Sequence, residues 1–100
     1  MVRVEGDSMT GERIYDGDVL VVDRMAEADD EDIVVARVGS EMCVKKLKII
    51  DGEVWLVPGN ERYQPLRITE EMDFAVWGKV IHVIHSLKKR KSSGLRPIKN

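Results

Sequence analysis

Short runs of β-forming residues, each ended by a turn signal, constrain the fold of this chain more than any other feature. The runs cover residues 2–4, 19–22, 33–38, 42–50, 54–57, 74–77 and 80–84. Val and Ile dominate them, and Gly, Asp, Asn and Pro stand between them. No sustained helical period occurs between Gly39 and Ser86, so helix should be limited to a turn after Ser8. The sequence predicts an all-β domain, mostly antiparallel, with little helix.

Two dipeptides predict where strands turn back. Asp51-Gly52 is a strong hairpin signal, because both central residues of a type I′ turn need a positive φ. Gly39-Ser40 suits a second tight hairpin. Together they predict an antiparallel meander over residues 33–57, in which residues 42–50 form a central strand paired on both sides.

The size and composition of the chain fit one soluble globular domain. One hundred residues can bury one hydrophobic core but not two. No apolar run approaches the roughly 20 residues of a spanning helix, and no signal peptide opens the chain. The single cysteine, Cys43, cannot form an internal disulfide, in keeping with a reducing compartment. We therefore expect a cytoplasmic protein without membrane contact.

Charge is distributed unevenly along the chain. Residues 87–100 contain six basic side chains and no acidic one, so all 18 acidic residues lie in residues 1–86. A basic segment can contact nucleic acid, but a solvated extension is the favoured interpretation. We expect residues 1–86 to form the folded domain and residues 87–100 to be a basic, flexible tail.

The motif Gly6-Asp7-Ser8-Met9 offers a nucleophile. Gly6 allows a sharp backbone turn, so that the Ser8 hydroxyl can stand clear of the sheet beside free backbone amides. Taken alone, the motif is more often a solvated loop serine. A serine hydroxyl is unreactive near neutral pH, and the catalytic interpretation therefore requires a base.

Strand geometry identifies Lys45 as a candidate base. With a period of two, one face of residues 42–50 carries Cys43, Lys45, Leu47 and Ile49, and the other carries Met42, Val44, Lys46 and Lys48. Lys45 is the only charged side chain on the first face, where its neighbours should partly bury it. Burial disfavours a charged ammonium, and a neutral amine can accept a proton from a serine. The alternative is a lysine whose ammonium extends into water.

The remaining chemical groups favour structural roles. His82 and His85 would point to opposite faces of a strand, so they cannot bind one metal ion together. Cys43 lies within a strand, where cysteine usually packs as a small hydrophobic residue. The acidic residues 29–32 lack the ligand pattern of a calcium loop and suit a surface turn. We expect no metal and no cofactor.

Several ordered motifs resemble those of a known family, the self-cleaving serine–lysine peptidase domains of LexA, UmuD and phage repressors. The motifs are Gly6-Asp7-Ser8-Met9 and the segments 16–22, 32–36, 44–47, 56–60, 63–66 and 78–83. The 37 residues from Ser8 to Lys45 are similar to the family's interval between nucleophile and base. The resemblance covers about residues 3–86.

The resemblance implies a fold like the C-terminal domain of LexA and UmuD, which forms a homodimer. It implies that Ser8 is the nucleophile, that Lys45 is its base, and that the backbone amides of Asp7 and Ser8 bind the oxyanion. It also implies self-cleavage promoted by a RecA filament. The family's cleavage site lies upstream of the serine, where this chain has only seven residues, so the target bond and any DNA-reading element are expected outside this chain.

Three functions are compatible with these observations. Residues 76–83 look most like UmuD, so a UmuD-like peptidase, the accessory subunit of an error-prone translesion polymerase, is the first expectation. The alternative is the dimerisation and self-cleavage domain of a LexA-like or phage-type transcriptional repressor. A further alternative is a non-catalytic dimeric interaction module. An upstream helix-turn-helix would indicate a repressor, and a short arm with an Ala-Gly or Cys-Gly bond would indicate a UmuD-like protein.

Overall fold

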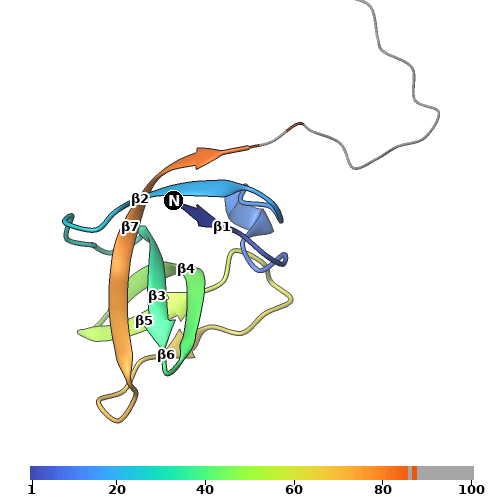
Figure 1. Cartoon of the computed structure of the whole chain (residues 1–100). Coiled ribbons are helices and arrows are strands. Elements are labelled where there is room, and N and C mark those ends of the chain that lie inside the picture. The colour runs from blue at the N-terminus through green and yellow to red at the C-terminus, as the bar shows by residue number, and fades with distance from the viewer. Residues whose placement is uncertain (86, 88–100) are drawn as a thin grey trace, which may run out of the picture.

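The computed structural model describes residues 1–85 and 87, which form one curled antiparallel sheet (Figure 1). The elements are β1 Val2–Arg3, the 3-10 helix η1 Thr10–Glu12, β2 Val19–Asp23, β3 Ile33–Val38, β4 Glu41–Ile50, β5 Glu53–Val57, β6 Leu66–Arg67 and β7 Phe74–Ile84. Across the sheet the order is β1-β2-β7-β3-β4-β5-β6, and every neighbouring pair is antiparallel. The all-β prediction is confirmed, and η1 is the turn expected after Ser8.

The predicted hairpins are present, with the backbone conformations that their turns require. Asp51 and Gly52 have φ values of 49° and 77°, as a type I′ turn demands, and they join β4 to β5. Gly39, at the turn between β3 and β4, has a φ of 61°. The predicted meander from β3 through β5 is therefore confirmed.

The central strand of this meander changes partner along its length. Residues Glu41–Lys46 pair with β3, and residues Lys46–Ile50 pair with β5. The prediction that this strand is paired on both sides holds only where its two halves meet, at Lys46, because each half has a single neighbouring strand. Within the described residues, the other edge of its first half meets no strand, and its backbone groups there remain free.

One expected strand boundary is wrong. Gly78 was expected to separate residues 74–77 from residues 80–84, but β7 runs through it without interruption. Gly78 is buried, and a Cβ atom at this position would collide with the Val22 side chain. Glycine is needed here because β2 approaches β7 closely, where β7 also shifts register against both neighbours.

The core consists of two apolar clusters on opposite sides of β3. One contains Val4, Met9, Ile14, Leu20 and Val35, and the other contains Val34, Ala36, Leu47 and Leu56. Successive residues of a strand face opposite ways, and β3 supplies buried side chains to both clusters. β3 therefore lies at the centre of the domain, with β4 beside it.

The acidic residues 29–32 form the charged turn that was expected, and this turn fastens β4. The Asp32 carboxylate accepts a hydrogen bond from the Asp29 amide (2.8 Å) and pairs with Lys79 (3.2 Å). The amide of Leu47 donates to the Asp32 carbonyl (2.8 Å), and the Glu31 amide donates to the Leu47 carbonyl (2.7 Å). These two hydrogen bonds continue the pairing of β3 with β4 as far as Leu47, where β4 already pairs with β5.

The expected tail lies outside the described residues, apart from the exposed Leu87, so the boundary after Ser86 stays a prediction. In the part of the chain that is described, no helix is long and apolar enough to cross a membrane.

The Asp32 contacts predict how stability changes in acid. The hydrogen bond from the Asp29 amide, aided by Lys79, holds the pKa of Asp32 below its ordinary value of 3.8. A carboxyl with a lowered folded-state pKa stabilises the protein above its unfolded pKa and loses that effect as pH falls through its folded pKa. Asp32→Ala should therefore lower the melting temperature at pH 7, and the difference from wild type should shrink below pH 3.8.

Thermal unfolding followed by circular dichroism across a pH series measures this difference. Asp73→Ala removes the exposed ion pair with Arg37 and serves as the control, which should change little at any pH. A deficit of Asp32→Ala that stays constant down to about pH 2 would contradict the role assigned to its charge.

Candidate active site

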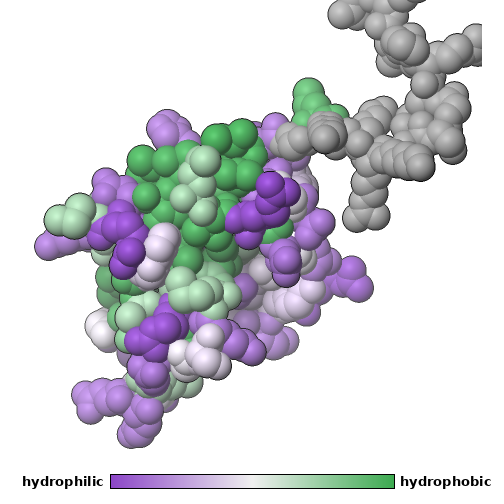
Figure 2. Space-filling model, viewed as in Figure 1, coloured by the Kyte–Doolittle hydropathy of each residue, from purple (hydrophilic) through white to green (hydrophobic). Residues whose placement is uncertain are grey.

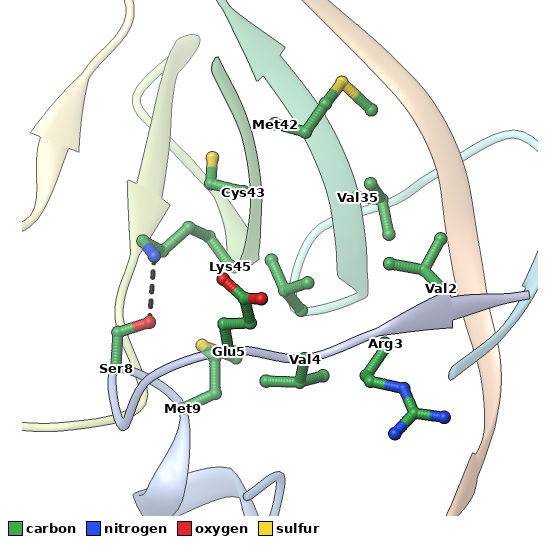
Figure 3. A pocket seen from close by; sticks show the side chains of 11 residues that line it. Val2, Arg3, Val4, Glu5, Ser8, Met9, Val35, Met42, Cys43 and Lys45 are labelled. Atoms are coloured by element: carbon green, nitrogen blue, oxygen red, sulfur yellow. Dashed lines mark hydrogen bonds between the residues drawn. The ribbon is translucent and has the colours of Figure 1, made fainter. Parts of the chain in front are cut away.

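The predicted nucleophile and base lie side by side. Lys45 Nζ donates a hydrogen bond of 3.0 Å to Ser8 Oγ across 37 residues of sequence (Figure 3). Both residues are half-buried. The long range of this contact means that the fold, and not local chain geometry, brings the hydroxyl and the amine together.

Ser8 stands on a turn that is fixed on both sides. Gly6 has a φ of 88°, which bends the chain as the motif predicted, and its amide donates to Asp16 Oδ1 (2.9 Å). The next side chain, Met9, is 1% exposed and belongs to the first core cluster. The hydroxyl of Ser8 is thus carried between a glycine bend and a buried anchor.

The segment before Ser8 is held by the turn that precedes β2. The Val4 amide donates to the Asp18 carbonyl and the Gly17 amide donates to the Val4 carbonyl, both at 2.8 Å. Asp18 is buried, and its carboxylate accepts the Tyr15 amide (2.9 Å) and lies 2.7 Å from Nδ1 of His85. His85 therefore has the structural role expected for it, because it helps to hold the turn that positions the segment leading to Ser8.

Lys45 is placed by the alternation of β4. It pairs with Val34 in the ladder and lies between the half-buried Cys43 and the buried Leu47 on its own face, as predicted. The opposite face of β4 also contacts other parts of the protein. Val44 packs against the first core cluster, and Lys46 Nζ lies 3.1 Å from Glu12 on η1. Both faces contact protein because the sheet curls around this strand.

The dyad lines a pocket of about 410 Å³ between the β1 segment and the free edge of β4 (Figure 3). The lining residues are Val2, Arg3, Val4, Glu5, Ser8, Met9, Val35, Met42, Cys43, Val44 and Lys45. Unpaired backbone groups at a strand edge can bind an extended peptide by adding it as a further strand. The pocket therefore combines a free strand edge with the Ser8 hydroxyl.

The Asp7 and Ser8 amides remain available to a ligand. Within residues 1–85, neither amide donates to a protein acceptor, whereas the Asp7 carbonyl accepts from the Thr10 amide and hydroxyl (3.4 and 3.2 Å). Unpaired amides beside a nucleophile can stabilise a developing oxyanion. The residues expected for the oxyanion site therefore have the freedom that this role needs.

Cys43 lines the pocket as a neutral thiol. Burial raises its pKa above the ordinary value, and the nearby Lys45 only partly opposes this effect. A thiol that stays protonated is a poor nucleophile and a poor metal ligand. In the described part of the chain, no group of three or more His, Cys, Asp or Glu side chains is arranged to hold a metal ion.

Two contacts to Asp7 were not expected from the sequence. Asn60 Nδ2 donates to the Asp7 carbonyl (2.9 Å), and the Tyr63 hydroxyl donates to the Asp7 carboxylate. Asn60 and Tyr63 belong to segments 56–60 and 63–66, which resemble the family. The sequence alone assigned neither residue a function. The Pro58-Gly59-Asn60 turn signal marks a loop without indicating which segment it meets, because the contacts span more than 50 residues.

Comparison with known proteins finds relatives that are named as LexA repressors. The LexA repressor of Xylella fastidiosa (strain M23) is 42% identical over 78 residues, which cover 78% of this chain and 37% of the repressor. LexA repressor 2 of Pseudomonas syringae pv. tomato (strain ATCC BAA-871 / DC3000) is 42% identical over 78 residues, covering 78% and 39%. The LexA repressor of Mycobacterium sp. (strain KMS) is 42% identical over 87 residues, covering 87% and 36%.

The chain thus spans 36–39% of the length of these relatives. Its residues 1–81 match the family described as Peptidase S24-like, and this match extends from β1 into β7. By this match, the chain belongs to the Peptidase S24-like family.

Proposed function

We propose that this chain is the serine peptidase and self-cleavage domain of a LexA-type transcriptional repressor, with residues 1–86 as the folded unit. The observation that carries the proposal is the 3.0 Å contact between Lys45 Nζ and Ser8 Oγ at the pocket. Membership of the Peptidase S24-like family and the similarity to LexA repressors support it.

The relatives favour a repressor over the UmuD-like polymerase subunit that was the first expectation. They are named as LexA repressors, and nothing among them points to a polymerase partner. The segment that looked most like UmuD, residues 76–83, surrounds the buried Gly78 and the register shifts of β7. Such packing requirements belong to the fold, so they do not distinguish its functions.

The mechanism begins with proton transfer between the paired side chains. Neutral Lys45 takes the proton of Ser8 Oγ while this oxygen attacks the scissile carbonyl carbon. The backbone amides of Asp7 and Ser8 stabilise the resulting oxyanion. Protonated Lys45 then gives its proton to the leaving nitrogen as the C–N bond breaks, and a water molecule, deprotonated by Lys45, hydrolyses the acyl-serine.

Lys45 differs from the other lysines of β4 in the partner of its amine. The other lysines of β4 form ion pairs, Lys46 with Glu12 and Lys48 with Glu31. Within the described residues, Lys45 forms no ion pair, and its nitrogen contacts a hydroxyl. A carboxylate partner would stabilise the ammonium and oppose its action as a base.

We further propose that the substrate is an extended segment upstream of Ser8 in the same polypeptide, bound along the free edge of β4. The family resemblance implies that a RecA filament promotes this cleavage. DNA reading is assigned to a part of the parent repressor outside this chain, which is consistent with relatives more than twice as long as the matched region.

The dyad predicts a specific pattern of activity loss. With quenched-fluorescent peptides centred on Ala-Gly, cleavage should rise with pH, because only the neutral amine of Lys45 accepts the Ser8 proton. Ser8→Ala and Lys45→Ala should each lower kcat by at least about a thousandfold, and the double variant should be no worse, since the two groups act as a unit. Lys48→Ala is the matched control on the same strand and should retain activity.

Circular dichroism of each variant checks that the fold persists. Lys48 is preferred to Lys46 as a control because Lys46 pairs with Glu12, close to the nucleophile turn. If Ser8→Ala cleaves as fast as the wild type, the peptidase proposal fails, and the interaction module becomes the better description of this domain.

The far end of β7 supports the expected homodimer. Here Ile81, Val83 and Ile84 are 46%, 39% and 52% exposed. Figure 2 shows apolar side chains gathered on the face where β2 and β7 lie in Figure 1. Pairing of β7 with β3 ends at Lys79, so within the described residues the last part of β7 pairs only with β2. An apolar strand with a free edge is suited to pairing with a second copy.

We therefore expect the chain to sediment as a dimer at micromolar concentrations. Ile84→Asp should shift it to monomer, because the new carboxylate would lose its hydration in the interface. Ile49→Asp, at a similarly exposed isoleucine on β4, should leave the dimer intact. Analytical ultracentrifugation distinguishes these outcomes, and a wild type that stays monomeric at high concentration would refute this arrangement.

A further inference from the structure

The loop that follows β5, residues 58–65, forms hydrogen bonds with Asp7, the residue immediately before Ser8. Asn60 Nδ2 donates to the Asp7 carbonyl (2.9 Å) and also reaches Thr10 Oγ1 (3.3 Å). The Tyr63 hydroxyl donates to the Asp7 carboxylate, and this hydrogen bond is the main reason that the pKa of Tyr63 lies above its ordinary value. Asp7 is thus held at both its backbone and its side chain.

Close backbone packing between this loop and the turn that carries Ser8 reinforces these hydrogen bonds. Gly59 lies so close to the nucleophile turn that a Cβ atom there would stand 2.7 Å from Glu12 Cγ and 3.1 Å from Met9 Cα. The Gly59 amide donates to Met9 Sδ (3.2 Å), and the Gly11 amide donates to the Gly59 carbonyl. Figure 1 shows the loop beside the turn that carries Ser8. The loop therefore has little freedom to move relative to the turn.

Fixing the Asp7 carbonyl also fixes the Ser8 amide. The two groups belong to one planar trans peptide, in which C=O and N–H point in opposite directions. Since the carbonyl faces Asn60 and Thr10, the Ser8 N–H points away from the loop. The preceding bend is fixed as well, because the Gly6 amide is bound to Asp16.

We propose that Asn60 and Tyr63 are positioning residues for catalysis, which orient the Asp7–Ser8 peptide so that its N–H is aimed at the oxyanion. This inference rests on the peptidase function proposed above. It assigns a catalytic purpose to a loop that contributes no side chain to the pocket, and it separates the orientation of the oxyanion donor from proton transfer by Lys45.

Asn60→Asp tests the donated hydrogen bond with little change of shape. The Asn60 Oδ1 atom accepts the Arg62 amide (2.9 Å), and an aspartate oxygen can keep this bond while losing the donor to Asp7. With the Ala-Gly peptide, kcat should fall by about tenfold or more while KM stays within about twofold, because a misaimed oxyanion donor weakens the transition state and not the bound substrate. The pH dependence of kcat should keep its midpoint.

Tyr63→Phe removes only the hydroxyl and should lower kcat in the same direction, by a few-fold. If Asn60→Asp fails to fold, the kcat of Tyr63→Phe tests the inference in its place. Lys48→Ala is again the control, since the ion pair of Lys48 with Glu31 involves neither Asp7 nor the loop. It should leave kcat unchanged.

Three results would overturn the inference. Unchanged kcat in both loop variants, with an active wild type, would mean that the loop does not orient the amide, while the peptidase proposal would stand. A shifted pH midpoint in Asn60→Asp would mean that the new charge acts on Lys45. A wild type that cleaves no better than Ser8→Ala would refute the peptidase proposal, and this inference with it.

Discussion

The change of partner along β4 is the constraint on which the rest of this structure depends. A strand paired on both sides throughout would have no free edge, and the nucleophile turn could not lie against it. Because β5 pairs only from Lys46 onward, the preceding residues keep one open edge, and Lys45 is the last of them. The Lys45 side chain reaches Ser8 from the face that it shares with Cys43 and Leu47, while its backbone stays in the ladder with β3.

The turn that carries Ser8, residues 6–9, is held by contacts from three parts of the fold. The turn before β2 binds the segment that leads to Ser8, Met9 anchors it in the core, and the loop after β5 grips Asp7. A reacting oxygen must be held within a fraction of an ångström of its productive position, and backbone contacts on rigid elements supply such precision.

Much of this arrangement could be predicted from local rules. Turn dipeptides located the hairpins, and the alternation of a single strand selected Lys45 over Lys46, because a period of two admits only one of them on the face of Leu47. Local rules failed where the determining contact was distant. Gly78 was interpreted as a strand end, although it is required by the close approach of Val22. β6, at two residues, is too short to show a period, and the roles of Asn60 and Tyr63 depend on a partner more than 50 residues away.

The central claim, that Lys45 activates Ser8, can be tested most directly without any peptide substrate. In the reaction with a fluorophosphonate, Ser8 Oγ would form a bond to phosphorus as fluoride leaves, and Lys45 would take the hydroxyl proton. Peptide mapping by mass spectrometry should find the label on Ser8 alone, at a rate that increases with pH and becomes negligible in Lys45→Ala. Labelling of Ser8 at an equal rate in Lys45→Ala, or labelling spread over other serines, would contradict the account.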